Sequence, residues 1–185
     1  MTEPLLIGAH GWDSPADGVY YPPELPEEGR FCFYSNRLRS VLLPARMWEV
    51  SGPAEVQQWR EDSDQQFRFV LEAPAPLARP AAADDSAARF AAFLSLIEPI
   101  RPRVAGMLLP VVSSVPPDAL PDADWLARTL VLIGAVMPVC VDLPVAWRSP
   151  SVLATLTRAD AGLCWHAGRE PAPHAGGRLL VALSP

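Results

Sequence analysis

Lysine is absent from this 185-residue chain, in which all 15 basic residues are arginine. Enzymes that form a Schiff base, pyridoxal-phosphate enzymes, P-loop nucleotide sites and Ser-x-x-Lys acylases all use a lysine amine. The sequence therefore excludes these classes. We ascribe the arginine bias itself to a GC-rich genome rather than to function.

Positive charge is also in deficit. The 15 arginines stand against 21 acidic residues, which gives a formal net charge of −6 at pH 7 and a pI near 5.0. Proteins that bind nucleic acid need clustered positive charge to contact phosphates. The charge balance therefore argues against a nucleic-acid partner.

Long apolar runs and cysteines are few. The longest apolar run, Thr129–Val141, is too short to cross a bilayer and contains Pro138. The N-terminus has no basic segment followed by an apolar stretch, so it predicts no signal peptide. We expect a cytoplasmic protein without membrane association. Cys32, Cys140 and Cys164 are widely spaced among apolar neighbours, a pattern that predicts buried free thiols.

Short apolar runs recur along the chain, mostly separated by segments with helical spacing of apolar residues. The first run ends in two glycines and an indole, which is typical of a strand buried on both faces that opens into a loop. The predicted strands are Leu5–Trp12, Leu38–Leu43, Phe67–Ala73, Val104–Val112, Val139–Leu143, Ala161–Trp165 and Leu179–Leu183. Proline and capping residues predict helix starts near Pro26, Pro53, Ser86, Pro121 and Ser149.

This alternation predicts an α/β fold with parallel crossovers, as in a doubly wound sheet or a (β/α) barrel. We expect one domain over residues 1–185 with a TIM-barrel-like (β/α) repeat. A complete eight-unit barrel usually needs about 200 residues or more. About seven strands in 185 residues therefore predict an incomplete or open barrel.

Four stretches carry a resemblance to a known family. They are Ile7–Trp12 at the first strand, Tyr20–Pro22 in the following loop, Phe67–Pro74 at the third strand and Trp147 after the fifth. In this order and spacing, the chain resembles the YecE-like family, the domain of unknown function 72. The resemblance implies a TIM-barrel-type fold with no well-established activity, and it identifies the chain as a short, degenerate member.

The departures from the family pattern fall at the barrel mouth. A glutamate and an asparagine typical of the second strand correspond to Leu42 and Pro44, the lysine usual at the end of the third strand to Glu72, and the glutamine of the fourth strand to a position near Pro110. The fifth strand of the family, of the form Glu-Phe-Arg-His, aligns with Val141–Pro144, and the Arg-x-His of the seventh strand with Ala182–Ser184. These replacements, mostly by apolar residues or proline, imply that the family's polar mouth is lost here.

Four residues that could bind a metal lie at or just past the ends of predicted strands. His10, Asp142, Cys164 and His166 follow the first, fifth and sixth strands, and parallel strands end on one face of a sheet. His166 lies two residues after Cys164, so both point to the same side of a strand. Asp142 and His166 are also candidate catalytic acid–base residues. The alternatives are exposed loop histidines, and an Asp142 that caps a loop or pairs with Arg148.

Trp12, Arg46 and Trp147 are candidate ligand-binding residues. The two indoles could stack on a flat ligand at the mouth, and Arg46 could contact a phosphate or carboxylate. For the indoles, we favour the alternative that they fill the vacated site. A solvated surface is the alternative for Arg46.

We predict a non-catalytic, barrel-derived protein without a cofactor that acts through a protein partner or as a homo-oligomer. An open sheet exposes strand edges that proteins normally cover or pair. The alternative is a metal-assisted hydrolase or isomerase, with a divalent metal ion held through His10, Asp142 and His166 at the strand ends.

Overall fold

The computed structural model describes residues 6–13, 20–74, 77, 86–111, 123–166 and 181–183. Parts of some predicted elements lie outside these residues, namely Leu5, Val112, the helix start at Pro121 and residues 179–180. The chain divides into two compact units, Met1–Leu71 with Leu94–Val104 and Glu72–Phe93 with Ala105–Pro185. The single domain over residues 1–185 stays a prediction.

Six strands form one sheet that follows chain order, β1-β2-β3-β4-β5-β6, and the pairs β1–β2, β2–β3, β4–β5 and β5–β6 are parallel. In the described part of the chain this sheet is not closed into a barrel. The prediction of an open, TIM-barrel-like α/β fold is therefore confirmed. The strands are β1 (Gly8–His10), β2 (Ser40–Leu43), β3 (Arg68–Glu72), β4 (Val104–Pro110), β5 (Val139–Asp142) and β6 (Gly162–Leu163).

The helices begin where proline and capping residues place them. Pro53 occupies the first turn of α3, and the Ser149 hydroxyl accepts a hydrogen bond from the Val152 N–H to cap α6. No described helix has the length and apolar character needed to cross a membrane. The helices are η1 (Glu27–Gly29), α1 (Arg30–Ser35), α2 (Ala45–Trp48), α3 (Pro53–Glu61), α4 (Ser86–Leu96), η3 (Arg101–Arg103), α5 (Ala123–Gly134), η4 (Val145–Trp147) and α6 (Pro150–Arg158).

Strand β1, in the N-terminal unit, corrects one prediction. The apolar run predicted a strand buried on both faces, but Gly8, Ala9 and His10 are all exposed, and Ile7 just before them is 65% exposed. Among the described residues, β1 pairs with β2 only. The reason is that a parallel strand is buried only where neighbours flank it, and β1 is an edge strand.

A tyrosine hydroxyl joins β1 to β2. The backbone N–H of Ala9 donates to Tyr34 Oη at 2.7 Å, and the Tyr34 hydroxyl donates to the carbonyl oxygen of Ser40 at 2.7 Å. Burial raises the pKa of Tyr34 to about 12, so the hydroxyl keeps its proton. Close approach also requires Gly8, because a Cβ there would lie 2.0 Å from the Ser40 oxygen.

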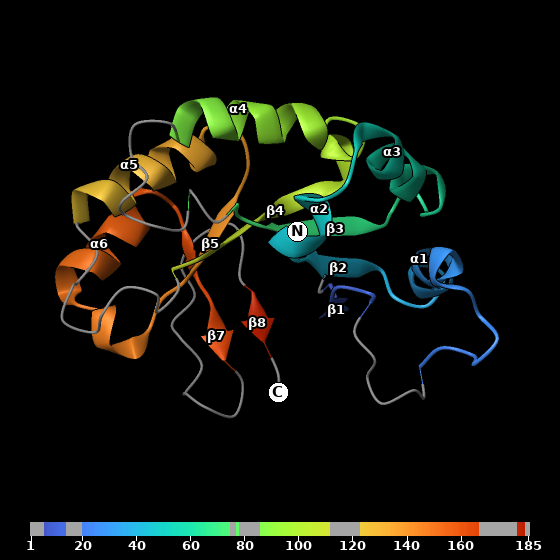
Figure 1. Cartoon of the computed structure of the whole chain (residues 1–185). Coiled ribbons are helices and arrows are strands. Elements are labelled where there is room, and N and C mark those ends of the chain that lie inside the picture. Colours follow the sequence, from blue (N-terminus) through green and yellow to red (C-terminus); the bar gives the residue numbers. More distant parts are fainter. Residues whose placement is uncertain are drawn as a thin grey trace. The chain divides into compact units, whose positions relative to one another are not determined.

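In the C-terminal unit, α5 and α6 lie side by side (Figure 1). Helix α5 packs against β5, and α6 packs against β6. The centre of this unit is apolar, and Leu109 and Val141 on neighbouring strands are fully buried. Strand β5 is thereby buried up to Val141, the residue before Asp142.

The predicted sixth and seventh strands are wrong in one respect. The stretch Ala161–Trp165 is not one strand of the main sheet, because it divides into β6 and a separate strand, β7 (Trp165–His166). Strand β7 pairs in parallel with β8 (Ala182–Leu183) in a second, two-stranded sheet. The chain changes partners at Cys164, whose N–H donates to the Val141 oxygen, while the next N–H donates to the Val181 oxygen.

We expect Tyr34→Phe to lower the free energy of unfolding by about 1–3 kcal/mol, because the Ala9 N–H and the Ser40 oxygen lose their shared partner. Tyr20→Phe is the matched control, since the buried Tyr20 hydroxyl has no hydrogen-bond partner among the described residues. Removal of the Tyr20 hydroxyl should change the free energy of unfolding little or not at all. Urea unfolding measures both, and equal losses would contradict a bridging role for Tyr34.

Candidate functional site

The candidate site forms where the chain leaves β5 and β6. Asp142 is the last residue of β5, and Cys164 lies between β6 and β7, two residues before His166. The hydrogen bond from the Cys164 N–H to the Val141 oxygen, 2.8 Å long, holds Cys164 beside the end of β5. The backbone therefore brings His166 close to Asp142, which lies 24 positions earlier in the chain.

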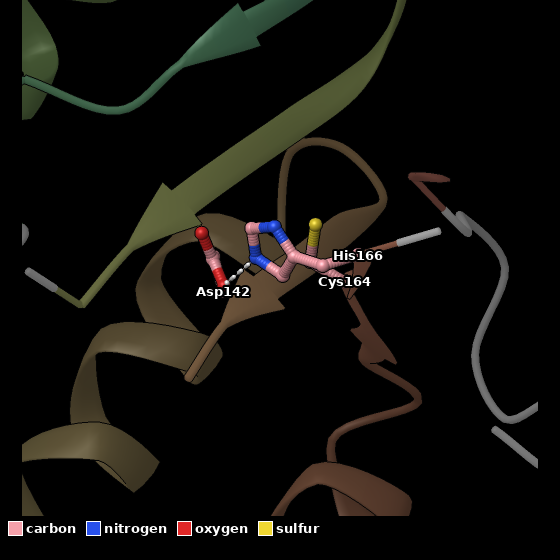
Figure 2. Close-up of side chains that lie close together, drawn as sticks. All are labelled: Asp142, Cys164 and His166. Atoms are coloured by element: carbon pink, nitrogen blue, oxygen red, sulfur yellow. Dashed lines mark hydrogen bonds and ion pairs between the residues drawn. The ribbon is translucent and has the colours of Figure 1, made fainter. Parts of the chain in front are cut away.

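Figure 2 shows the three side chains converging. His166 Nε2 donates to Asp142 Oδ1 at 2.9 Å, and each of these two side chains is 27% exposed. Cys164 is fully buried. One donor atom from each residue lies within 4.8 Å of the other two, so the three together could hold a metal ion.

Cys164 carries a protonated thiol in this arrangement. The Cys140 side chain hydrogen-bonds to it, and this bond together with burial and the nearby Asp142 charge raises the pKa of Cys164 well above the ordinary thiol range. Cys140 is itself fully buried, two residues before Asp142 on β5. The site is thus a carboxylate and an imidazole with a buried thiol pair behind them.

Three of the four predicted metal ligands come together. His10 ends β1 in the N-terminal unit and is not a member of the group of Asp142, Cys164 and His166. The predicted alternative for Asp142, a salt bridge to Arg148, stays a prediction. The Arg148 guanidinium donates through Nε and Nη2 to the Leu143 carbonyl oxygen, at 3.1 and 2.9 Å.

Arg46 lies in α2 and binds a carboxylate of its own chain. Its Nη1 and Nη2 donate to the two oxygens of Asp13, with 3.0 Å for the Nη2 bond. Asp13 reaches this position because Gly11 adopts a positive φ of 78° and its N–H donates to the Leu42 oxygen. The hydrogen bond from Arg46 lowers the pKa of Asp13. A ligand carboxylate or phosphate at Arg46 would have to compete with Asp13.

The two candidate ligand-stacking indoles are buried. Trp12 is 9% exposed, and its ring centroid lies 4.4 Å from Phe31 and 5.2 Å from Trp59. Trp147 is 3% exposed at the end of η4. Their packing is of the kind expected for side chains that fill space, and stacking on a ligand stays a prediction.

Sequence reasoning missed two participants. Asp13 pairs with a residue 33 positions away, and no local pattern connects the two. Cys140 had a detectable signal in the sequence, since Cys140-x-Asp142 and Cys164-x-His166 have the same spacing. The prediction that all three cysteines are buried is wrong for Cys32, which is exposed on the short helix α1.

Comparison with known proteins identifies the family to which the chain belongs. A model for the family described as "Protein of unknown function DUF72" matches residues 6–180. No curated protein matches the chain.

Solved structures resemble the chain in fold. A DUF72 family protein from Thermotoga maritima superposes with a TM-score of 0.69 and 17% identity, covering 93% of this chain and 67% of its own. A DUF72 family protein from Enterococcus faecalis gives 0.66 and 14%, covering 91% and 64%. D-psicose 3-epimerase, solved in the presence of D-fructose, gives 0.52 and 11%, covering 88% and 63%. This chain spans about two thirds of the length of these proteins, and the likeness is one of fold alone.

The thiols differ in exposure, which predicts different reactivities. In the folded protein, we expect only Cys32 to react quickly with a disulfide reagent, because Cys140 and Cys164 are fully buried. Ellman's reagent should give one fast thiol per native chain and three after denaturation, and Cys32→Ser should remove the fast phase. Two or three fast native thiols would contradict the burial.

The Asp13–Arg46 pair predicts a pH dependence. Because the pKa of Asp13 is lowered in the folded chain, the pair stabilises the fold fully above the unfolded-state pKa of about 3.9 and loses this effect as pH falls through the folded pKa. Both side chains are partly exposed, so the effect on stability is small. A carboxyl-carbon NMR titration should give Asp13 a midpoint below its ordinary value.

Arg46→Gln should raise that midpoint toward the ordinary range. Arg39→Gln is the control, since Arg39 pairs with a different carboxylate, Asp64, at 3.8 Å. An Asp13 midpoint that does not move in Arg46→Gln would rule out the hydrogen bond as its cause.

Proposed function

We propose, from the premise that this chain belongs to the DUF72 family, that it is a non-catalytic member that acts by self-association through the edge strand β1. DUF72 is a family of unknown function, so the proposal depends on the residues of this chain. The observation that carries it is the exposed edge at Ile7, Gly8 and Ala9.

The edge lacks two of the features by which proteins block strand addition, charge and proline, although β1 is short, at three residues. Natural edge strands are protected by charged side chains, proline or bulges, and residues 7–9 contain no charge and no proline. Ile7 presents an apolar side chain at 65% exposure beside the strand. These features favour pairing of β1 with another strand.

A second copy of the chain is the occupant we favour. Two identical edge strands can pair antiparallel across a twofold axis, which extends each sheet into its partner and matches Ile7 of one copy with the same surface of the other. A strand from a different protein could use the same backbone groups, and the experiment below distinguishes the two.

The absence of catalysis is supported by the strand ends. Positions that are polar in the family pattern are Leu42 at the end of β2, Pro44 before α2 and Pro110 at the end of β4. None of these side chains can transfer a proton or accept a hydrogen bond. The free thiols Cys32, Cys140 and Cys164 favour a reducing compartment, and we place the association in the cytoplasm.

Ile7→Arg tests the proposal against Val50→Arg. Both replace an exposed apolar residue of the N-terminal unit, 65% and 85% exposed, with the same charge, and only Ile7 adjoins β1. Sedimentation velocity over about a hundredfold range of concentration should show a dimer for the unmodified chain and for Val50→Arg, but a monomer for Ile7→Arg. The physical reason is that the arginine would have to be desolvated at the strand interface.

A monomer of the unmodified chain at every concentration would refute self-association. A dimer that survives Ile7→Arg would refute the use of the β1 edge. Circular dichroism of each variant establishes that it is folded.

A further inference from the structure

We propose that Asp142, Cys164 and His166 form a zinc site at the carboxyl end of β5. The proposal is independent of self-association, because these residues belong to the C-terminal unit and β1 to the N-terminal unit. It combines a ligand set of three different donor atoms with a backbone that already brings them together.

The spacing of the donor atoms is close to that of a metal site. Zinc lies about 2.0–2.3 Å from its ligands, so tetrahedral ligand atoms are about 3.3–3.8 Å apart. The carboxylate oxygen, the thiol sulfur and an imidazole nitrogen lie within 4.8 Å of one another. Side-chain movements that bring the donor atoms about an ångström closer together would therefore complete the coordination without movement of the strands.

The backbone reduces the ordering that binding requires. Asp142 ends a strand paired on both sides, with β4 and β6, and the Cys164 N–H is fixed on the Val141 oxygen. The 2.9 Å contact between His166 Nε2 and Asp142 Oδ1 already holds the imidazole ring against the carboxylate, and the ring nitrogen that coordinates zinc would give up its proton. Figure 2 shows the ring and the carboxylate side by side at the end of the strand.

The donor types select the ion. Magnesium and calcium prefer oxygen ligands only, whereas a set of thiolate, imidazole and carboxylate suits zinc. Cys164 is buried, while Asp142 and His166 are each 27% exposed, so an ion can enter from the side of these two residues. Three protein ligands leave the fourth tetrahedral position to water.

Cys140 is not one of the three converging ligands. It is fully buried and lies on the same side of β5 as Asp142, because the two are two residues apart.

Cobalt and zinc binding to the full, untagged chain test the proposal. After chelator treatment, reloading with excess zinc and dialysis to remove unbound metal, we expect one zinc ion per chain by elemental analysis. Titration with cobalt(II) should give a near-ultraviolet thiolate-to-metal charge-transfer band. Cys164→Ala should lose the band, and His166→Asn and Asp142→Asn should weaken binding at least about tenfold to a hundredfold.

Cys32→Ser and His10→Asn are the matched controls, since they remove a thiol and an imidazole outside the site. Both should retain one ion and the band. Should Cys164→Ala fail to fold, the two partly exposed positions, Asp142 and His166, carry the test by circular dichroism and binding. Lack of metal uptake by the unmodified chain would overturn the proposal. So would uptake that the site variants leave unchanged or that Cys32→Ser abolishes.

Discussion

The change of backbone partner at Cys164 is the constraint on which the candidate site depends. Up to Cys164 the chain pairs with β5, through the Cys164 N–H on the Val141 oxygen, and immediately after it the chain pairs toward β8. Had β6 continued in register, Trp165 and His166 would have remained in the main sheet. The exchange instead produces the 2.9 Å bond between His166 and Asp142.

The N-terminal unit meets a different constraint, because β1 has only one strand beside it among the described residues. The Tyr34 hydroxyl, donor to Ser40 and acceptor from Ala9, adds a side-chain bridge to the backbone pairing of β1 with β2. Its burial keeps it neutral, which a group that must both donate and accept requires. The attachment is therefore well defined on one side of β1 and leaves the other side available for strand addition.

Much of the fold was predictable because buried parallel strands are continuous apolar runs, and β2, β3, β4 and β5 all lie within the predicted ranges. The exposure of β1 was not, since its sequence contains no information on whether a second neighbour exists. The convergence of Asp142 with Cys164 and His166 followed from strand ends and from spacing of two. The Asp13–Arg46 pair depends on a positive φ at Gly11 and a helix, α2, that no pattern predicted.

The proposed absence of catalysis and the proposed zinc site rest on different residues at the strand ends. Leu42 near the end of β2 and Pro110 at the end of β4 offer no side-chain hydrogen-bonding group there. Asp142, Cys164 and His166 are nonetheless brought together by backbone pairing at the end of β5. A zinc ion would use them as a ligand set, without requiring that the ion take part in catalysis.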